Sequence, residues 1–101
     1  MASRLELHEE LCNLLGSRNV YFQPPSTIKM KYPAIVYSLD AMDTKYANAN
    51  TYAINVRYSL TYIDADPESE KVQEFLKLPY CRFNRFYVSD NLNHYTYTIY
   101  Y

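Results

Sequence analysis

Apolar and polar residues alternate most regularly over residues 52–63. A period of two places successive side chains on opposite faces of a β-strand. The alternation therefore predicts a long strand with one buried face and one wetter face. The predicted buried face consists of Tyr52, Ile54, Val56, Tyr58, Leu60 and Tyr62.

The first residues of the chain follow a helical period instead. The apolar stripe, at the spacing of one helix face, consists of Leu5, Leu7, Leu11, Cys12, Leu14 and Leu15. Ser3 and Glu6 have the spacing of a capping box, and Gly16 is the residue type expected just past a helix end. We therefore predict a helix from about Arg4 to Leu15 that packs by one face.

Further strands are predicted where β-branched and aromatic residues dominate, at 34–39, 83–88 and 95–101, with a short strand at 20–22. The segment Ala41 to Thr51 lacks the Asn-Gly pair typical of a tight hairpin turn. We therefore expect it to be a protruding loop between two paired strands.

A second helix is predicted after Asp66-Pro67-Glu68, because Asp caps free amides and Pro suits the first helical position. Pro79 ends it, and its apolar side consists of Val72, Phe75 and Leu76. The element order α-β-β-β-α-β-β predicts a single α+β domain over residues 1–101. We expect a mainly antiparallel sheet of four to five strands with two helices packed on one face.

Composition narrows the range of functions. The chain has one Gly and no Trp, which argues against a glycine-loop nucleotide site, and its net charge of -1 gives no general attraction to nucleic acid or an anionic membrane. No secretory signal and no apolar run of about 20 residues is apparent. We expect a soluble protein made in a cytoplasm, without membrane association.

Candidate catalytic and metal-binding residues are few. Asp64, Asp66 and Glu68 are closely spaced carboxylates, but they lack the Gly and distal Glu of a calcium loop, so helix capping is the favoured role. For His8 and His94 no nucleophile or orienting group can be assigned, and structural roles are favoured.

The two cysteines add no site. Cys12 and Cys81 lie far apart in the sequence without a CxxC pattern, so we expect two reduced thiols. We expect a protein that is not an enzyme and that holds no cofactor or metal.

Residues 82–87 interleave arginines with aromatic residues, as single-strand-binding surfaces do. The segment lacks the glycines of an RNA-recognition motif, so an ordinary strand with one break in its alternation, such as a bulge, is favoured. The thirteen Tyr fit both a sheet with good β propensity and surfaces at which subunits meet. Both interpretations stay open.

Several phrases distributed over nearly the whole chain carry a family resemblance. They are Tyr32-Pro33-Ala34-Ile35-Val36-Tyr37, Tyr52-Ala53-Ile54-Asn55-Val56-Arg57-Tyr58, Ile63-Asp64-Ala65-Asp66-Pro67-Glu68, Leu76-Lys77-Leu78-Pro79 and Asp90-Asn91-Leu92-Asn93-His94-Tyr95. With them the chain resembles small phage tail terminators and the related tail-completion and head-tail joining proteins of long-tailed bacteriophages.

The resemblance implies a virion structural protein that assembles in the host cytoplasm. Its copies would form a ring, usually a hexamer, that ends the growing tail tube and joins the head. The implied partners are other copies of the chain, the major tail tube protein and a head-completion or neck protein. Phage DNA would pass through the channel without sequence-specific binding.

A closed ring needs two different complementary patches on each subunit. The predicted loop supplies the candidate interface residues, which are Met42, Asp43, Lys45, Tyr46, Asn48 and Asn50. The alternatives are a head-tail connector or stopper of the neck and, from a different class, a small nucleic-acid-binding module.

Overall fold

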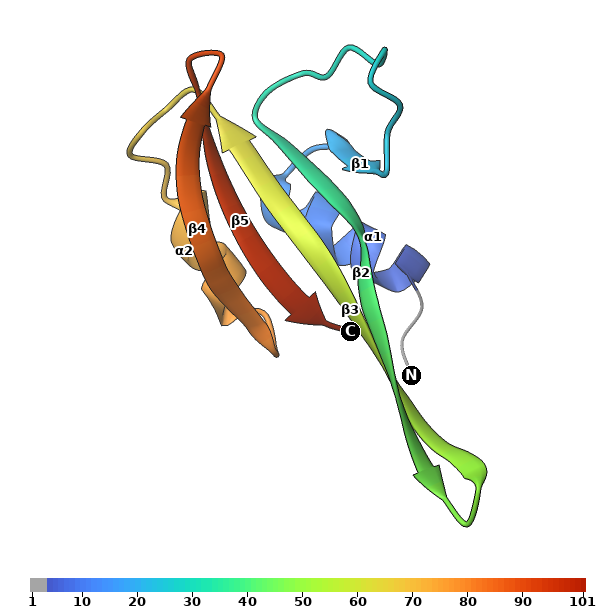
Figure 1. Cartoon of the computed structure of the whole chain (residues 1–101). Helices are drawn as coiled ribbons and strands as arrows, with labels where there is room; N and C mark the ends of the chain where they lie inside the picture. The colour runs from blue at the N-terminus through green and yellow to red at the C-terminus, as the bar shows by residue number, and fades with distance from the viewer. Residues whose placement is uncertain (1–3) are drawn as a thin grey trace.

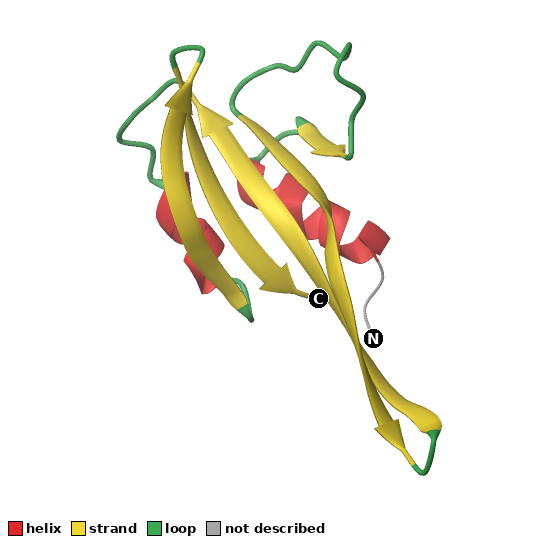
Figure 2. Ribbon diagram, in the orientation of Figure 1, coloured by secondary structure: helices red, strands yellow, loops and turns green. Residues whose placement is uncertain are grey.

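A curved five-stranded sheet carries both helices on one of its faces (Figures 1 and 2). The computed structural model describes residues 4–101, except for the side chains of residues 47 and 51–53. The elements in chain order are α1 (Arg4–Leu15), β1 (Val20–Phe22), β2 (Ala34–Ala47), β3 (Asn50–Asp64), α2 (Lys71–Glu74), the 3₁₀ helix η1 (Phe75–Lys77), β4 (Cys81–Ser89) and β5 (Leu92–Tyr100).

The order of the strands across the sheet is β1-β2-β3-β5-β4. β1 pairs with β2 in parallel, and the other three pairings are antiparallel. The predicted α+β class and element order are confirmed, and the sheet is mixed because of the one short parallel strand.

The core lies between the sheet and the helices, as the period-two pattern predicts. Tyr58, Leu60 and Tyr62 of β3 are buried, as are Tyr95 and Tyr97 of β5. Toward the other end of β3 the burial fades, since Val56 is only partly buried and Ile54 is exposed. Tyr52 was predicted on the same face, but its side chain lies outside the described residues.

Tyrosine can fill this core because the phenol hydroxyls reach polar partners at its rim. Tyr62 donates to Asp64 Oδ2 at 2.6 Å, and Tyr97 donates to the carbonyl of Val72 at 2.8 Å. A buried hydroxyl without a partner would destabilise the fold by about 1–3 kcal/mol. Among the described residues, every buried side-chain nitrogen or oxygen has a hydrogen-bond partner.

Helix α1 has the predicted bounds and packs on the sheet. Its buried residues are Leu7, Leu11, Cys12 and Leu15. Leu5 was predicted in the same stripe but is exposed, because two residues correspond to a rotation of about 200° and place it opposite Leu7. Gly16 ends the helix with φ +80°. Ser3, the predicted capping residue, lies outside the described residues.

The second helix begins later than predicted. Asp64 Oδ1 accepts from the amide of Asp66 at 3.0 Å, and Asp66 Oδ1 accepts from the amide of Glu68 at 2.9 Å. These local bonds hold the segment in turns, so α2 begins only at Lys71.

The apolar side of the second helix was also only partly predicted. Phe75 is buried and Val72 packs partly against the core, but Leu76 is exposed and Leu78 packs in its place. The change from α-helix to a 3₁₀ turn at Phe75 alters which residues face the sheet.

Both β-hairpins close more tightly than the sequence predicts. The expected loop over residues 41–51 is wrong: β2 continues to Ala47, β3 begins at Asn50, and only Asn48 and Ala49 lie between them. Likewise only Asp90 and Asn91 join β4 to β5, where a longer connection was expected. All four turn residues have positive φ, as tight turns between twisted strands require, although none is Gly.

Candidate assembly surfaces

The hairpin of β2 and β3 projects beyond the rest of the sheet (Figure 1). We call the part of β2 after Leu39 and of β3 before Arg57, with the turn between them, the arm. The pairing of β5 with β3 begins at Arg57, and β1 pairs with β2 only as far as Tyr37. The arm is therefore a two-stranded ribbon, and it contributes to the longest dimension of 51 Å, against 28 and 23 Å in the other directions.

The predicted interface residues all lie on this arm and are all exposed. They are Met42, Asp43, Lys45, Tyr46, Asn48 and Asn50. Met42 is 60% exposed and Tyr46 is 69% exposed, which is high for large apolar side chains. The structure brings the residues together on a strand pair rather than on a loop, and their role in an interface stays a prediction.

The two faces of the arm differ in chemistry. Met42 pairs with Val56, which packs partly against the core, so Met42 lies on the core-side face of the sheet. Alternation along the two strands then places Ile54 on the same face and Asp43 on the opposite, open face. The apolar face of the arm therefore continues the core-side face past the end of the helices.

At the opposite end of the sheet, β4 is an exposed edge strand. All its residues except Cys81 are exposed. Phe83 and Phe86 contact the core tyrosines Tyr97 and Tyr95, with ring centroids 5.6 and 5.0 Å apart. They therefore lie on the core-side face, yet they remain 44% and 48% exposed. The short second helix leaves this margin of the sheet uncovered.

A bulge explains the mixed pattern of residues 82–87. The register of β4 with β5 shifts between Phe83 and Arg85, which confirms the predicted break in alternation. Arg82 pairs with Thr98 and Arg85 with Thr96, so both arginines lie on the open face. The basic residues and the two phenylalanines thus point to opposite sides of the sheet.

This division weakens the case for a single-strand-binding surface, which needs cations and stacking rings on one side. Tyr87 is the one aromatic residue of the segment on the open face, and its ring already has neighbours. It stacks on His94 with centroids 4.7 Å apart, and the Arg85 guanidinium lies 5.0 Å from its centre.

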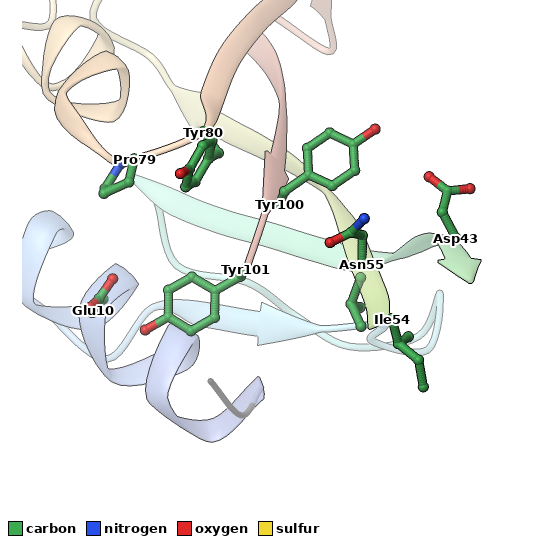
Figure 3. A pocket seen from close by; sticks show the side chains of 9 residues that line it. Glu10, Asp43, Ile54, Asn55, Pro79, Tyr80, Tyr100 and Tyr101 are labelled. Carbon is green, nitrogen blue, oxygen red and sulfur yellow. The ribbon is translucent and has the colours of Figure 1, made fainter. Parts of the chain in front are cut away.

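A hollow of about 760 Å³ opens where the arm leaves the sheet (Figure 3). It is lined by Glu10, Asp43, Ile54, Asn55, Val56, Pro79, Tyr80, Tyr100 and Tyr101. Burial, and then a hydrogen bond to Glu10, raises the pKa of Tyr101 to about 12. Tyr101 also fixes the last residues to the arm, since its amide donates to the carbonyl of Val56 at 3.1 Å.

The remaining candidate residues have structural partners. Nδ1 of His8 lies 2.7 Å from the Tyr37 hydroxyl, and Nδ1 of His94 lies 3.0 Å from the carbonyl of Leu92. Burial raises the pKa of Cys81 to about 11, which makes its thiol a poor nucleophile at neutral pH. Over residues 4–101, no three His, Cys, Asp or Glu side chains gather closely enough to hold a metal ion.

The sequence pattern predicts the strand at β4 but misses that it is an uncovered edge. Only the full strand order identifies β4 as the last strand of the sheet. The helix predicted between Asp66 and Pro79 is longer than the observed α2, so nothing in the sequence indicated that Phe83, Phe86 and Val88 stay uncovered.

No protein-family model and no curated protein matches the chain. Among the described residues, neither helix has the length and apolar character needed to cross a membrane.

Proposed function

We propose that the chain is a virion structural protein of a long-tailed bacteriophage, a tail terminator. Its copies form a ring, a hexamer by the family resemblance, on the last ring of the tail tube. The ring stops tube polymerisation and provides the surface that the head-completion or neck protein binds. The protein performs no catalysis in this role and uses no cofactor.

The observation that carries this proposal is the pair of unlike exposed surfaces at the two ends of one sheet. The arm carries Met42 and Tyr46, and β4 carries Phe83 and Phe86, all with large exposed apolar surface. Contiguous apolar surface of this kind is typical of sites where proteins meet. Two different patches per subunit are what a head-to-tail ring requires, whereas a two-fold dimer needs only one.

Charge supports passage of DNA without its recognition. The net charge of -1 provides little attraction to phosphates. The exposed Arg82 and Arg85 add only a small local positive charge on β4. The chain can therefore surround DNA without holding it strongly.

The test is the length of tail tubes. Tube protein from the phage or prophage that encodes the chain is polymerised with and without the purified chain, and the tubes are imaged by negative-stain electron microscopy. We expect shorter tubes that end in a ring of added density. Tubes of unchanged length with bare ends would overturn the proposal.

The same experiment separates the alternatives. A connector or stopper would bind the neck protein without shortening the tubes. A nucleic-acid-binding module would leave the tubes unchanged and would give a gel shift of single-stranded DNA that weakens with salt.

A further inference from the structure

Among the described residues the sheet ends at β1 and β4, and the arm leaves further edges of β2 and β3 unpaired; two of these edges are long and suit each other. One is the outer edge of β4, the last strand of the sheet. The other is the outer edge of β2 along the arm, where β1 no longer reaches and the Leu39 amide binds the Gln23 side chain instead. An unpaired edge presents free amide and carbonyl groups and is a ready template for another strand.

The apolar faces of these two edges match. On β4 the core-side residues Phe83, Phe86 and Val88 are exposed, Val88 by 60%. On the core-side face of β2, Met42 and, just before the arm, Leu39 are exposed. If the two strands pair side by side with a common core-side face, these side chains form one continuous apolar strip.

The open face offers one complementary contact, between Asp43 of β2 and the arginines of β4. β4 carries Arg82 and Arg85 and no acidic residue. The free edge of β2 carries Asp40, Asp43 and Lys45. Asp40 already binds Arg57 at 2.7 Å on the open face, so Asp43 is the carboxylate that can face an arginine of β4. In β4 a bulge lies between Arg82 and Arg85, so both arginines point to the open side. In β2 Asp40 is itself the bulge residue, and Asp43 lies on the open side opposite Asn55.

Charge also disfavours two rival pairings, of β4 with a second β4 and of β4 with the free edge of β3. Two copies of β4 would set arginine against arginine, and like charges opposite one another destabilise a strand pair. The free edge of β3 on the arm, residues 50–55, carries no charged residue that could attract β4.

We propose that β4 of one copy pairs with the free edge of β2 in the arm of the next copy. The five-stranded sheet then continues from copy to copy. Because the two edges lie at opposite ends of the sheet, the contact is head-to-tail and can propagate into a ring. This joint rests on the proposed function only in taking the neighbour to be a second copy of the chain.

Disulfide trapping tests the joint. Asp43 and Arg85 lie near the middle of their free edges, so they oppose each other in either strand direction. In a Cys81→Ser background, the pair Asp43→Cys with Arg85→Cys is compared with the control pair Asn13→Cys with Arg85→Cys, since Asn13 is an exposed residue of α1.

Under mild oxidation we expect the first pair to form a ladder of linked copies at least about tenfold faster than the control pair, because pairing raises the local thiol concentration. The reaction is run on concentrated protein and on protein bound to tube ends. Equal rates for the two pairs, or no ladder in either setting, would overturn the joint.

Charge reversal gives a second measurement. Arg85→Glu and Asp43→Lys should each abolish association in sedimentation velocity, and a mixture of the two variants should restore it. Restoration fits only a contact between unlike edges, and failure of the mixture would contradict the joint. Rings on tube ends without a ladder would leave the tail-terminator proposal intact and remove the joint, whereas a ladder without tube capping would do the reverse.

Discussion

The strands β2 and β3 run through both the helix-covered part of the sheet and the arm. Their apolar side chains are buried in the first part and exposed in the second. Under the helices, Tyr37 of β2 and Leu60 of β3 are fully buried. A few residues further along the same strands, Met42, Tyr46 and Ile54 are exposed. The difference comes from coverage, because neither helix extends over the arm (Figure 2).

The covered and the exposed apolar side chains should therefore have different roles. Side chains under the helices should determine the free energy of unfolding, and side chains on the arm and on β4 should determine association.

The largest effect is expected from Phe75→Ala. Phe75 is fully buried and stacks on Tyr97 with centroids 4.7 Å apart. Removing such a ring should lower the free energy of unfolding by about 3–5 kcal/mol. Urea denaturation measures the loss, with Phe83→Ala as the matched control, since Phe83 is a half-exposed ring against the same tyrosine. Equal losses for the two variants would contradict the expectation that side chains under the helices determine stability and those on β4 do not.

Alkaline pH should reduce stability through the buried tyrosines. Burial raises the pKa of Tyr62 and of Tyr97 above the ordinary value. The folded protein then keeps protons that the unfolded chain loses, so their contribution is complete below about pH 10 and declines above it. For each pH unit above 10 we expect a loss of about 1.4 kcal/mol per buried tyrosine.

Denaturation series between pH 7 and 11 measure this slope. Tyr97→Phe should reduce the slope of the free energy of unfolding against pH by the contribution of one tyrosine. A slope unchanged by Tyr97→Phe, or stability that does not decline above pH 10, would show that these tyrosines are not buried as described.

A smaller loss is expected from Tyr62→Phe at neutral pH. The Tyr62 hydroxyl donates to Asp64 and lies 2.9 Å from Ser69 Oγ, so the substitution leaves both partners without it. We expect a loss of about 1–2 kcal/mol in thermal or urea unfolding. Tyr46→Phe on the arm is the control and should change nothing, because no described residue bonds its exposed hydroxyl.

A small gain is expected from Ala49→Gly. Ala49 has φ +64°, where an ordinary side chain costs about 1–2 kcal/mol and glycine does not. Part of that gain is offset by the greater freedom of glycine in the unfolded chain, which leaves about 0.5–1 kcal/mol. Differential scanning calorimetry should show a higher Tm, and a lower Tm would mean that the turn is not built as described.

The smallest effect on stability is expected from Met42→Ala combined with Tyr46→Ala. These exposed side chains should change the free energy of unfolding by less than about 0.5 kcal/mol. Association measured by sedimentation should nevertheless weaken. A large loss of stability would mean that the arm packs on the body of the protein.

The regular parts of the fold were predictable from sequence, because one face of each element is buried. Period-two alternation locates β3 and β5, and the leucine stripe locates α1 within its observed bounds. The arm could not be predicted, since its bulge near Tyr46 disturbs the alternation and its turn lacks the Asn-Gly signal. The predicted start of α2 was wrong for a different reason. The Asp66 carboxylate accepts a hydrogen bond in a local turn before the helix begins.

The candidate surfaces were predictable in part. The predicted protruding loop implied that the candidate interface residues are exposed, and their exposure is observed although the loop itself was wrong. Which strand forms an edge depends on pairings between distant segments, such as β5 inserting between β3 and β4. No local pattern encodes that order, so β4 as a surface appeared only in the structure.

The tyrosine hydroxyls at the rim of the core have a mechanical consequence. Tyr97 of β5 bonds the carbonyl of Val72 in α2, and Tyr37 of β2 bonds Arg4 and lies beside His8 in α1. Each helix is therefore joined to one strand by a hydrogen bond as well as by apolar packing. These hydrogen bonds would therefore resist sliding of each helix over the strand that it contacts.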